Sequence, residues 1–187
     1  MSSAARVGDR ERLRLFVAFR LPEETLRHLV SWQQDVLRPP EGVRVVPKEN
    51  LHVTIAFLGH RPAEELDAIA GAAREAAQTG ERPVLTPTRY RETRSVGMLV
   101  FDDEGGLATR IAEDVHERLE RLGVYEREQR RWLPHVTVAR FRKPPRLHPP
   151  VPELGRVALS DAAVYISKLR RGGAEYEVLE SFALGGR

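Results

Sequence analysis

The chain has 187 residues, of which 41% are hydrophobic and 30% are charged, with a formal net charge of +3 and no cysteine. This length and composition are typical of one globular domain and exclude a disordered or fibrous protein. The lack of cysteine excludes disulfides and thiolate catalysis, and no apolar run approaches the ~20 residues of a membrane-spanning helix, so we expect a cytoplasmic protein without a membrane partner.

Short apolar runs and helical periodicity predict strands mixed with a few helices along the chain. Strands are expected over residues 13–19, 51–58, 83–90, 94–102, 133–141, 163–169 and 176–184. Helices are expected over residues 23–37, 66–77 and 107–122, the first of them ended by Pro39 and Pro40. Because strands and helices do not alternate strictly, the pattern favours an α+β fold over a doubly wound parallel sheet.

The chain is expected to form one domain behind a short flexible terminus. Residues 1–12 carry arginines but no apolar stretch, which indicates a flexible N-terminus rather than a secretory signal. The proline-rich segment 144–152 precedes only a hairpin, so we interpret it as a surface crossing and not as a linker. Residues 13–187 are therefore predicted to be a single domain.

An internal repeat relates the two halves of the chain. His52-Val-Thr-Ile and His135-Val-Thr-Val lie 83 residues apart. The same offset places the predicted strand 15–19 on residues 98–102 and the predicted helix 23–37 on residues 106–120. Two copies of a strand–helix–strand unit, related by a pseudo-twofold axis, account for this pattern most simply.

The repeated His-x-Thr motif predicts a catalytic site for a phosphodiester. Side chains two apart in a strand project to the same face, so His52 with Thr54, and His135 with Thr137, point away from the core. If the strands meet at the axis, two imidazoles and two hydroxyls converge on one cleft. The hydroxyls can bind phosphate oxygens, while one imidazole serves as general acid and the other as general base near neutral pH. The sequence alone does not say which histidine has which role.

Two cations are weaker candidates for phosphate binding. Arg140 closes the second motif, although strict alternation places it on the face opposite His135. Lys48 shares the parity of His52 and is expected at the rim of the cleft. A metal site is the main chemical rival, but both motif strands, 51–58 and 133–141, contain no Asp or Glu and no HExxH pattern. We therefore predict no metal and no cofactor.

Several stretches resemble the two-histidine (2H) phosphoesterase superfamily, and within it the RNA 2′,3′-cyclic phosphodiesterases, also called 2′-5′ RNA ligases. They are Arg14-Leu-Phe-Val-Ala-Phe19, Pro47-Lys-Glu-Asn-Leu-His-Val-Thr-Ile-Ala-Phe-Leu-Gly59, Pro134-His-Val-Thr-Val-Ala-Arg140 and Gly173-Ala-Glu-Tyr176 with Phe182. The resemblance implies a bilobal α+β fold, with two antiparallel sheets and outer helices around a central cleft. It also implies that His52 is the proton donor and His135 the proton acceptor.

The same resemblance implies the reaction and its partners. Such enzymes open RNA 2′,3′-cyclic phosphate ends to 2′-phosphomonoesters, and can join tRNA fragments by 2′-5′ ligation. Two alternatives stay open: the same chemistry on a small cyclic nucleotide or ADP-ribose cyclic phosphate, and a non-catalytic RNA-binding module. We expect a monomer that acts on RNA ends.

Overall fold

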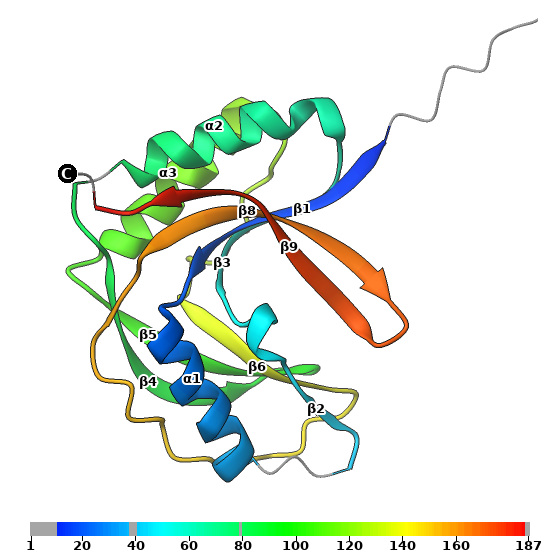
Figure 1. The fold of residues 1–187 in the computed structure, drawn as a ribbon, viewed down its shortest axis with the longest axis vertical. Helices are drawn as coiled ribbons and strands as arrows, with labels where there is room; N and C mark the ends of the chain where they lie inside the picture. Colours follow the sequence, from blue (N-terminus) through cyan, green and yellow to red (C-terminus); the bar gives the residue numbers. More distant parts are fainter. Residues whose placement is uncertain (1–10, 38–40, 79, 186–187) are drawn as a thin grey trace, which may run out of the picture.

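The computed structural model describes residues 11–37, 41–78 and 80–185. Within them, nine strands form one curled sheet in which the neighbouring strands are antiparallel (Figure 1). The strands are β1 Arg12–Arg20, β2 Val43–Val45, β3 Val53–Pro62, β4 Val84–Glu92, β5 Val96–Glu104, β6 His135–Phe141, β7 Val157–Ala158, β8 Asp161–Arg170 and β9 Gly173–Ala183. Their order is β7-β4-β5-β6-β3-β1-β8-β9, and β2 pairs with β6. This confirms a mixed fold of antiparallel strands and helices.

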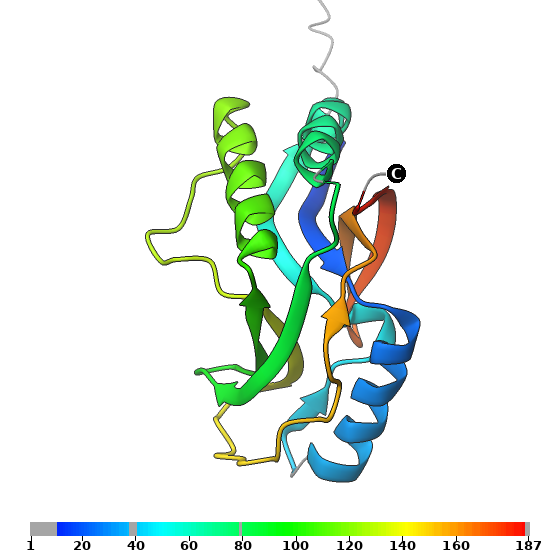
Figure 2. The same cartoon turned by 90° about the vertical axis from the view of Figure 1, so that its left-hand side faces the viewer.

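Three α-helices flank the sheet, and none of those in the described residues is long and apolar enough to cross a membrane. They are α1 Glu23–Trp32, α2 Leu66–Ala77 and α3 Leu107–Arg121. Helices α2 and α3 lie side by side at one end of the molecule, and α1 lies at the other end (Figure 2). Helix α3 begins where the Asp103 carboxylate accepts the backbone N–H groups of Ala108 and Thr109, at 3.1 and 2.7 Å.

The two faces of the sheet have different environments. On β1, Leu15, Val17 and Phe19 are buried in the main core, to which all three helices contribute. The alternating residues Phe16 and Ala18 belong instead to a small cluster on the other face of the sheet. The period of two in a strand thus separates a helix-covered face from a second face that is open for a site.

A single residue pair joins the two halves of the sheet. Strands β3 and β6 are paired only through Val53 and Val136. On one side of this junction lie β1, β8 and β9, and on the other lie β2, β4, β5 and β7. The sequence predicted two separate sheets, whereas this pair makes the described strands continuous.

The strand registers correct the predicted offset between the halves. Ala18 of β1 lies opposite Thr54, and Met98 of β5 lies opposite Thr137. The offset for this strand is therefore 80 residues, and the counterpart of residues 15–19 is 95–99 rather than 98–102. Three more residues separate β5 from its His-x-Thr motif than separate β1 from its own, which the constant offset of 83 between the motifs conceals.

The remaining differences concern short elements and chain ends. Strands β2 and β7 were not predicted, because three and two residues are too short for a periodic pattern. The first helix becomes a π-helical turn over Gln33–Leu37, and the end predicted at Pro39 and Pro40 lies outside the described residues. The flexible terminus predicted over 1–12 also lies outside them, except for its last two residues, of which Arg12 begins β1.

Candidate active site

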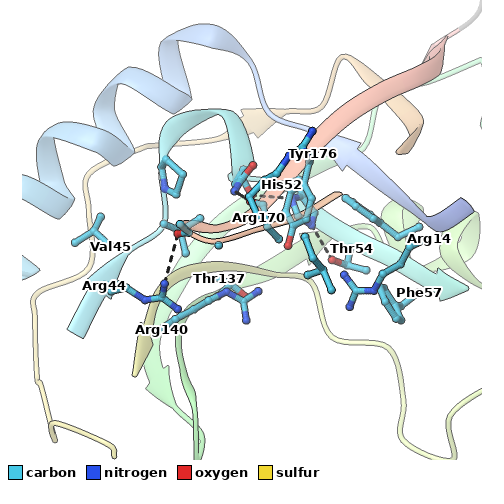
Figure 3. A pocket seen from close by; sticks show the side chains of 18 of the residues that line it. Arg14, Arg44, Val45, His52, Thr54, Phe57, Thr137, Arg140, Arg170 and Tyr176 are labelled. Atoms are coloured by element: carbon cyan, nitrogen blue, oxygen red, sulfur yellow. Dashed lines mark hydrogen bonds between the residues drawn. The ribbon is translucent and has the colours of Figure 1, made fainter. Parts of the chain in front are cut away.

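The two motif histidines line one cavity of about 640 Å³ on the open face of the sheet. His52 directly precedes β3 and His135 begins β6, so the two residues adjoin the Val53–Val136 junction. Thr54 and Thr137 line the same cavity, as the His-x-Thr spacing predicted (Figure 3). The curled sheet therefore brings both motifs together, with Val53 and Val136 fully buried behind them.

Both imidazoles are oriented by the backbone in the same way. His52 Nδ1 lies 2.8 Å from the carbonyl oxygen of Asn50, and His135 Nδ1 lies 2.8 Å from that of Leu133. A carbonyl can only accept, so Nδ1 carries the proton in each neutral ring. Each Nε2 is thereby left as the nitrogen available for proton transfer, and that of His52 lies 3.0 Å from the hydroxyl of Thr54.

An aromatic wall desolvates His52. The ring of Phe16 lies 4.9 Å from the imidazole, and Tyr176 contacts it edge-on at 5.4 Å. Burial lowers the pKa of His52 to about 4, against the hydrogen bond to the Asn50 carbonyl, and the charges of His135 and Arg140 lower it further. In the free protein at neutral pH, His52 is therefore a neutral imidazole, and a nearby anion is needed to make it a proton donor.

A β-bulge in each motif strand turns Arg140 toward the cavity. The pairing with the neighbouring strand passes from Thr137 directly to Ala139 in β6, and from Thr54 directly to Ala56 in β3. The extra residues, Val138 and Ile55, are buried. One added residue reverses the alternation, so Arg140 lines the cavity although strict alternation predicted the opposite face.

The cavity lining is cationic. Four arginines line it, and none of its lining residues is Asp or Glu: Arg14, Arg44, Arg140 and Arg170. Figure 3 shows Arg44 and Arg140 on one side, and Arg14 with Phe57 on the other. The Arg14 guanidinium is held by the hydroxyl of Ser167 at 2.7 Å and lies over the ring of Phe57 at 4.7 Å. Such a lining favours an anionic ligand such as a phosphodiester.

Sequence reasoning missed two of these arginines. Arg44 lies in β2, directly opposite Arg140 in the strand register, but the short β2 carried no signal. Arg170 comes from the turn between β8 and β9, which reaches the cavity from the far end of the chain. Only the three-dimensional fold brings these segments together.

Lys48 does not reach the cavity, in contrast to its predicted place at the rim. Residues Lys48–Asn50 form a 3₁₀ turn, so the strand parity that linked Lys48 to His52 does not apply. Its ammonium group forms an ion pair with Glu23. Within the described ranges, no three His, Cys, Asp or Glu side chains gather as a metal site would need.

Comparisons with known proteins agree with this geometry. A family model described as LigT like Phosphoesterase matches residues 19–89. An RNA 2′,3′-cyclic phosphodiesterase of Thermus thermophilus is 36% identical over 185 residues, covering 93% of this chain and 91% of the relative. One of Escherichia coli is 30% identical over 172 residues, covering 91% and 96%. The crystal structure of E. coli LigT complexed with 3′-AMP has a TM-score of 0.77 at 27% identity, and the match covers 94% of this chain and 100% of that one.

Proposed function

Because the chain belongs to the LigT-like phosphoesterase family, together with the RNA 2′,3′-cyclic phosphodiesterases, we propose that it hydrolyses 2′,3′-cyclic phosphate ends of RNA to 2′-phosphomonoesters. The observation that carries this proposal is the pair of imidazoles, each fixed through Nδ1, in one cavity without carboxylates. Two proton-transfer groups around a cationic cavity suit in-line attack of water on a phosphodiester.

In the proposed mechanism, the two histidines act on opposite sides of one phosphorus atom. His135 Nε2 accepts a proton from water as the water oxygen bonds to phosphorus, and the bond from phosphorus to the 3′-oxygen breaks. His52 Nε2 donates a proton to that leaving oxygen. This order of roles rests on the family resemblance, while the fixed Nδ1 contacts explain why Nε2 is the reacting nitrogen in both rings.

The lowered pKa of His52 makes the substrate part of the acid. With a pKa of about 4, the imidazole is neutral before binding. A cyclic phosphodiester brings a negative charge into the same desolvated cavity, and a neighbouring anion favours the protonated ring. We therefore propose that His52 takes up its proton together with the substrate.

Three further side chains are proposed to hold the phosphate. The hydroxyls of Thr54 and Thr137 can donate to its non-bridging oxygens, once that of Thr54 leaves His52 Nε2. The Arg140 guanidinium adds a fixed positive charge. The same arrangement can run the reverse reaction, with a ribose 5′-hydroxyl in place of water, which is 2′-5′ ligation of RNA such as tRNA fragments.

We also propose that residues 13–187 form one bilobal, duplicated domain with a pseudo-twofold axis at the Val53–Val136 pair. Its support is that these two residues are separated by the same 83 positions as the histidines. Action as a cytoplasmic monomer without a metal ion stays a prediction.

One experiment separates the proposed reaction from its alternatives. The EDTA-treated protein is incubated with an oligonucleotide ending in 2′,3′-cyclic phosphate and, separately, with a mononucleotide 2′,3′-cyclic phosphate. We expect turnover of the oligonucleotide with a 2′-phosphate product. Binding without turnover would indicate an RNA-binding module, and turnover of the mononucleotide alone would indicate a small-molecule enzyme. Activity lost in EDTA and restored by Zn²⁺ or Mg²⁺ would contradict the two-imidazole mechanism.

A further inference from the structure

Two buried polar side chains on helical segments contact the bulges of the motif strands. Gln33 Nε2 donates to the carbonyl of Val138 at 2.9 Å, and His116 Nε2 lies 2.7 Å from the carbonyl of Ile55. Gln33 is 1% exposed and His116 is 5% exposed. Both the donors and the acceptors are 83 residues apart, so the two contacts occupy equivalent places in the repeat.

These carbonyls belong to the two residues that the β-bulges leave unmatched. Ile55 has no partner in the registers of β3 with β1 or with β6, and Val138 has none in the register of β6 with β5. The bulged residues are buried, and a buried carbonyl needs a donor. His116 supplies one to Ile55, while Val138 receives Gln33 as well as the backbone N–H of Val46 at 3.0 Å.

Each donor serves the motif strand of the other half. Gln33 follows α1, the helix after β1, but it binds β6. His116 lies on α3, the helix after β5, but it binds β3. Gln33 Nε2 also donates to the Val46 carbonyl at 3.0 Å, which attaches the segment after β2 to the same bulge. The two contacts therefore connect the halves on either side of the cavity.

We propose that Gln33 and His116 are positioning residues, which hold the two β-bulges and thereby keep Arg140 and Phe57 facing the cavity. The bulge at Val138 is what reverses the alternation before Arg140, and that at Ile55 does the same before Phe57. Without a donor on the bulge carbonyl, the regular ladder competes, and regular pairing turns the following side chains toward the helices. The readout of this proposal through phosphate rests on the proposed function.

The test for Gln33 measures binding of inorganic phosphate by calorimetry. Gln33→Leu removes the donor at similar volume, and Gln34→Leu is the matched control because Gln34 is the exposed neighbour. We expect Gln33→Leu to weaken phosphate affinity about tenfold or more, since small displacements of a binding group cost this much. In an Arg140→Ala background, the same substitution should have no further effect, because Gln33 acts through Arg140.

Donor-retaining variants separate positioning from packing. Gln33→His and His116→Gln exchange the two donors between the halves, and we expect each to keep at least half of the phosphate affinity or kcat/KM that the corresponding Leu variant loses. His116→Leu should lower kcat/KM about tenfold. The exposed His28 provides the matched control, His28→Leu.

Each outcome decides the proposal. Equal phosphate affinity in Gln33→Leu and the unsubstituted protein, or an equal loss in the Arg140→Ala background, would overturn it. If the unsubstituted protein binds no phosphate, the proposed function fails instead. The bulge is then tested by the ¹⁵N–¹H signals of residues 138–140, which should shift in Gln33→Leu and return in Gln33→His. If a Leu variant does not fold, the single donor-exchange variants and Arg140→Ala supply the comparison, and loss of phosphate binding in Gln33→His would then contradict the proposal.

Discussion

Val53 of β3 and Val136 of β6 form the one residue pair that joins these two strands. Because the strands are antiparallel, His52 precedes Val53 on the side toward Thr137, and His135 precedes Val136 on the side toward Thr54. Each half of the chain thus supplies one imidazole and one hydroxyl to a common cavity. The account of function depends on this junction, since a register shift of one residue would turn one motif into the core.

The two histidines can be tested by removal. We expect His52→Ala and His135→Ala each to lower kcat by at least ~10², because each removes a general acid or base. Both side chains are half-buried at the cavity, so the variants should stay folded. Steady-state kinetics and thermal unfolding are measured together. A folded variant with unchanged kcat would remove that histidine from the mechanism.

Arg140 should matter more for phosphate binding than for folding. Hydrogen bonds to charged groups contribute about 1.5–3 kcal/mol, so Arg140→Ala is expected to weaken phosphate binding roughly 10- to 100-fold. Arg142→Ala is the matched control, because Arg142 is exposed and does not line the cavity. Titration with inorganic phosphate measures both. Equal affinities in the two variants would place Arg140 outside the phosphate site.

The two threonines should have smaller and similar effects. Thr54→Ala and Thr137→Ala each remove one neutral hydroxyl, which typically contributes about 0.5–1.5 kcal/mol, so a loss of roughly 2- to 10-fold in kcat/KM is expected. Thr54→Ala also removes the hydroxyl next to His52 Nε2 in the free protein. Kinetics of the two variants side by side provide the measurement. A loss as large as that of a histidine variant would indicate a direct role in proton transfer.

Phosphate should raise the pKa of His52. In the free protein, burial holds this pKa at about 4, so the ring is neutral throughout the neutral range. A bound phosphate favours the imidazolium, and by linkage phosphate then binds more weakly as the pH rises through the new pKa. The ring proton signals of His52 are followed by NMR between pH 3 and 9, with and without phosphate. A pKa that phosphate leaves unchanged would contradict the proposed uptake of a proton with the substrate.

The repeat made the motifs and the main helices predictable from sequence. The paired His-x-Thr triplets, the buried valines and the terminal hairpin needed only strand periodicity. The placement of Arg140 needed more, because one extra residue at Val138 changes which face every later side chain occupies. A bulge leaves no mark in a pattern of apolar residues. It was the register of the neighbouring strand that revealed it.

Other parts of the site depend on contacts between distant segments. Arg44 lies in a three-residue strand, and Arg170 lies in a turn near the other end of the chain, so local patterns could not connect either with the histidines. Lys48 failed for a local reason, since a 3₁₀ turn replaced the expected strand. Gln33 and His116 are polar residues within helical patterns. Their roles became visible only with the bulges that they contact.

The most direct test of the central claim is a crystal structure of the protein with a nucleoside 2′-phosphate, the product of the proposed reaction. We expect Nε2 of His52 and Nε2 of His135 each to lie within about 3.2 Å of an oxygen bound to the same phosphorus or of the 3′-oxygen. A phosphate that contacts only one imidazole, or that binds outside the cavity between β3 and β6, would contradict the account.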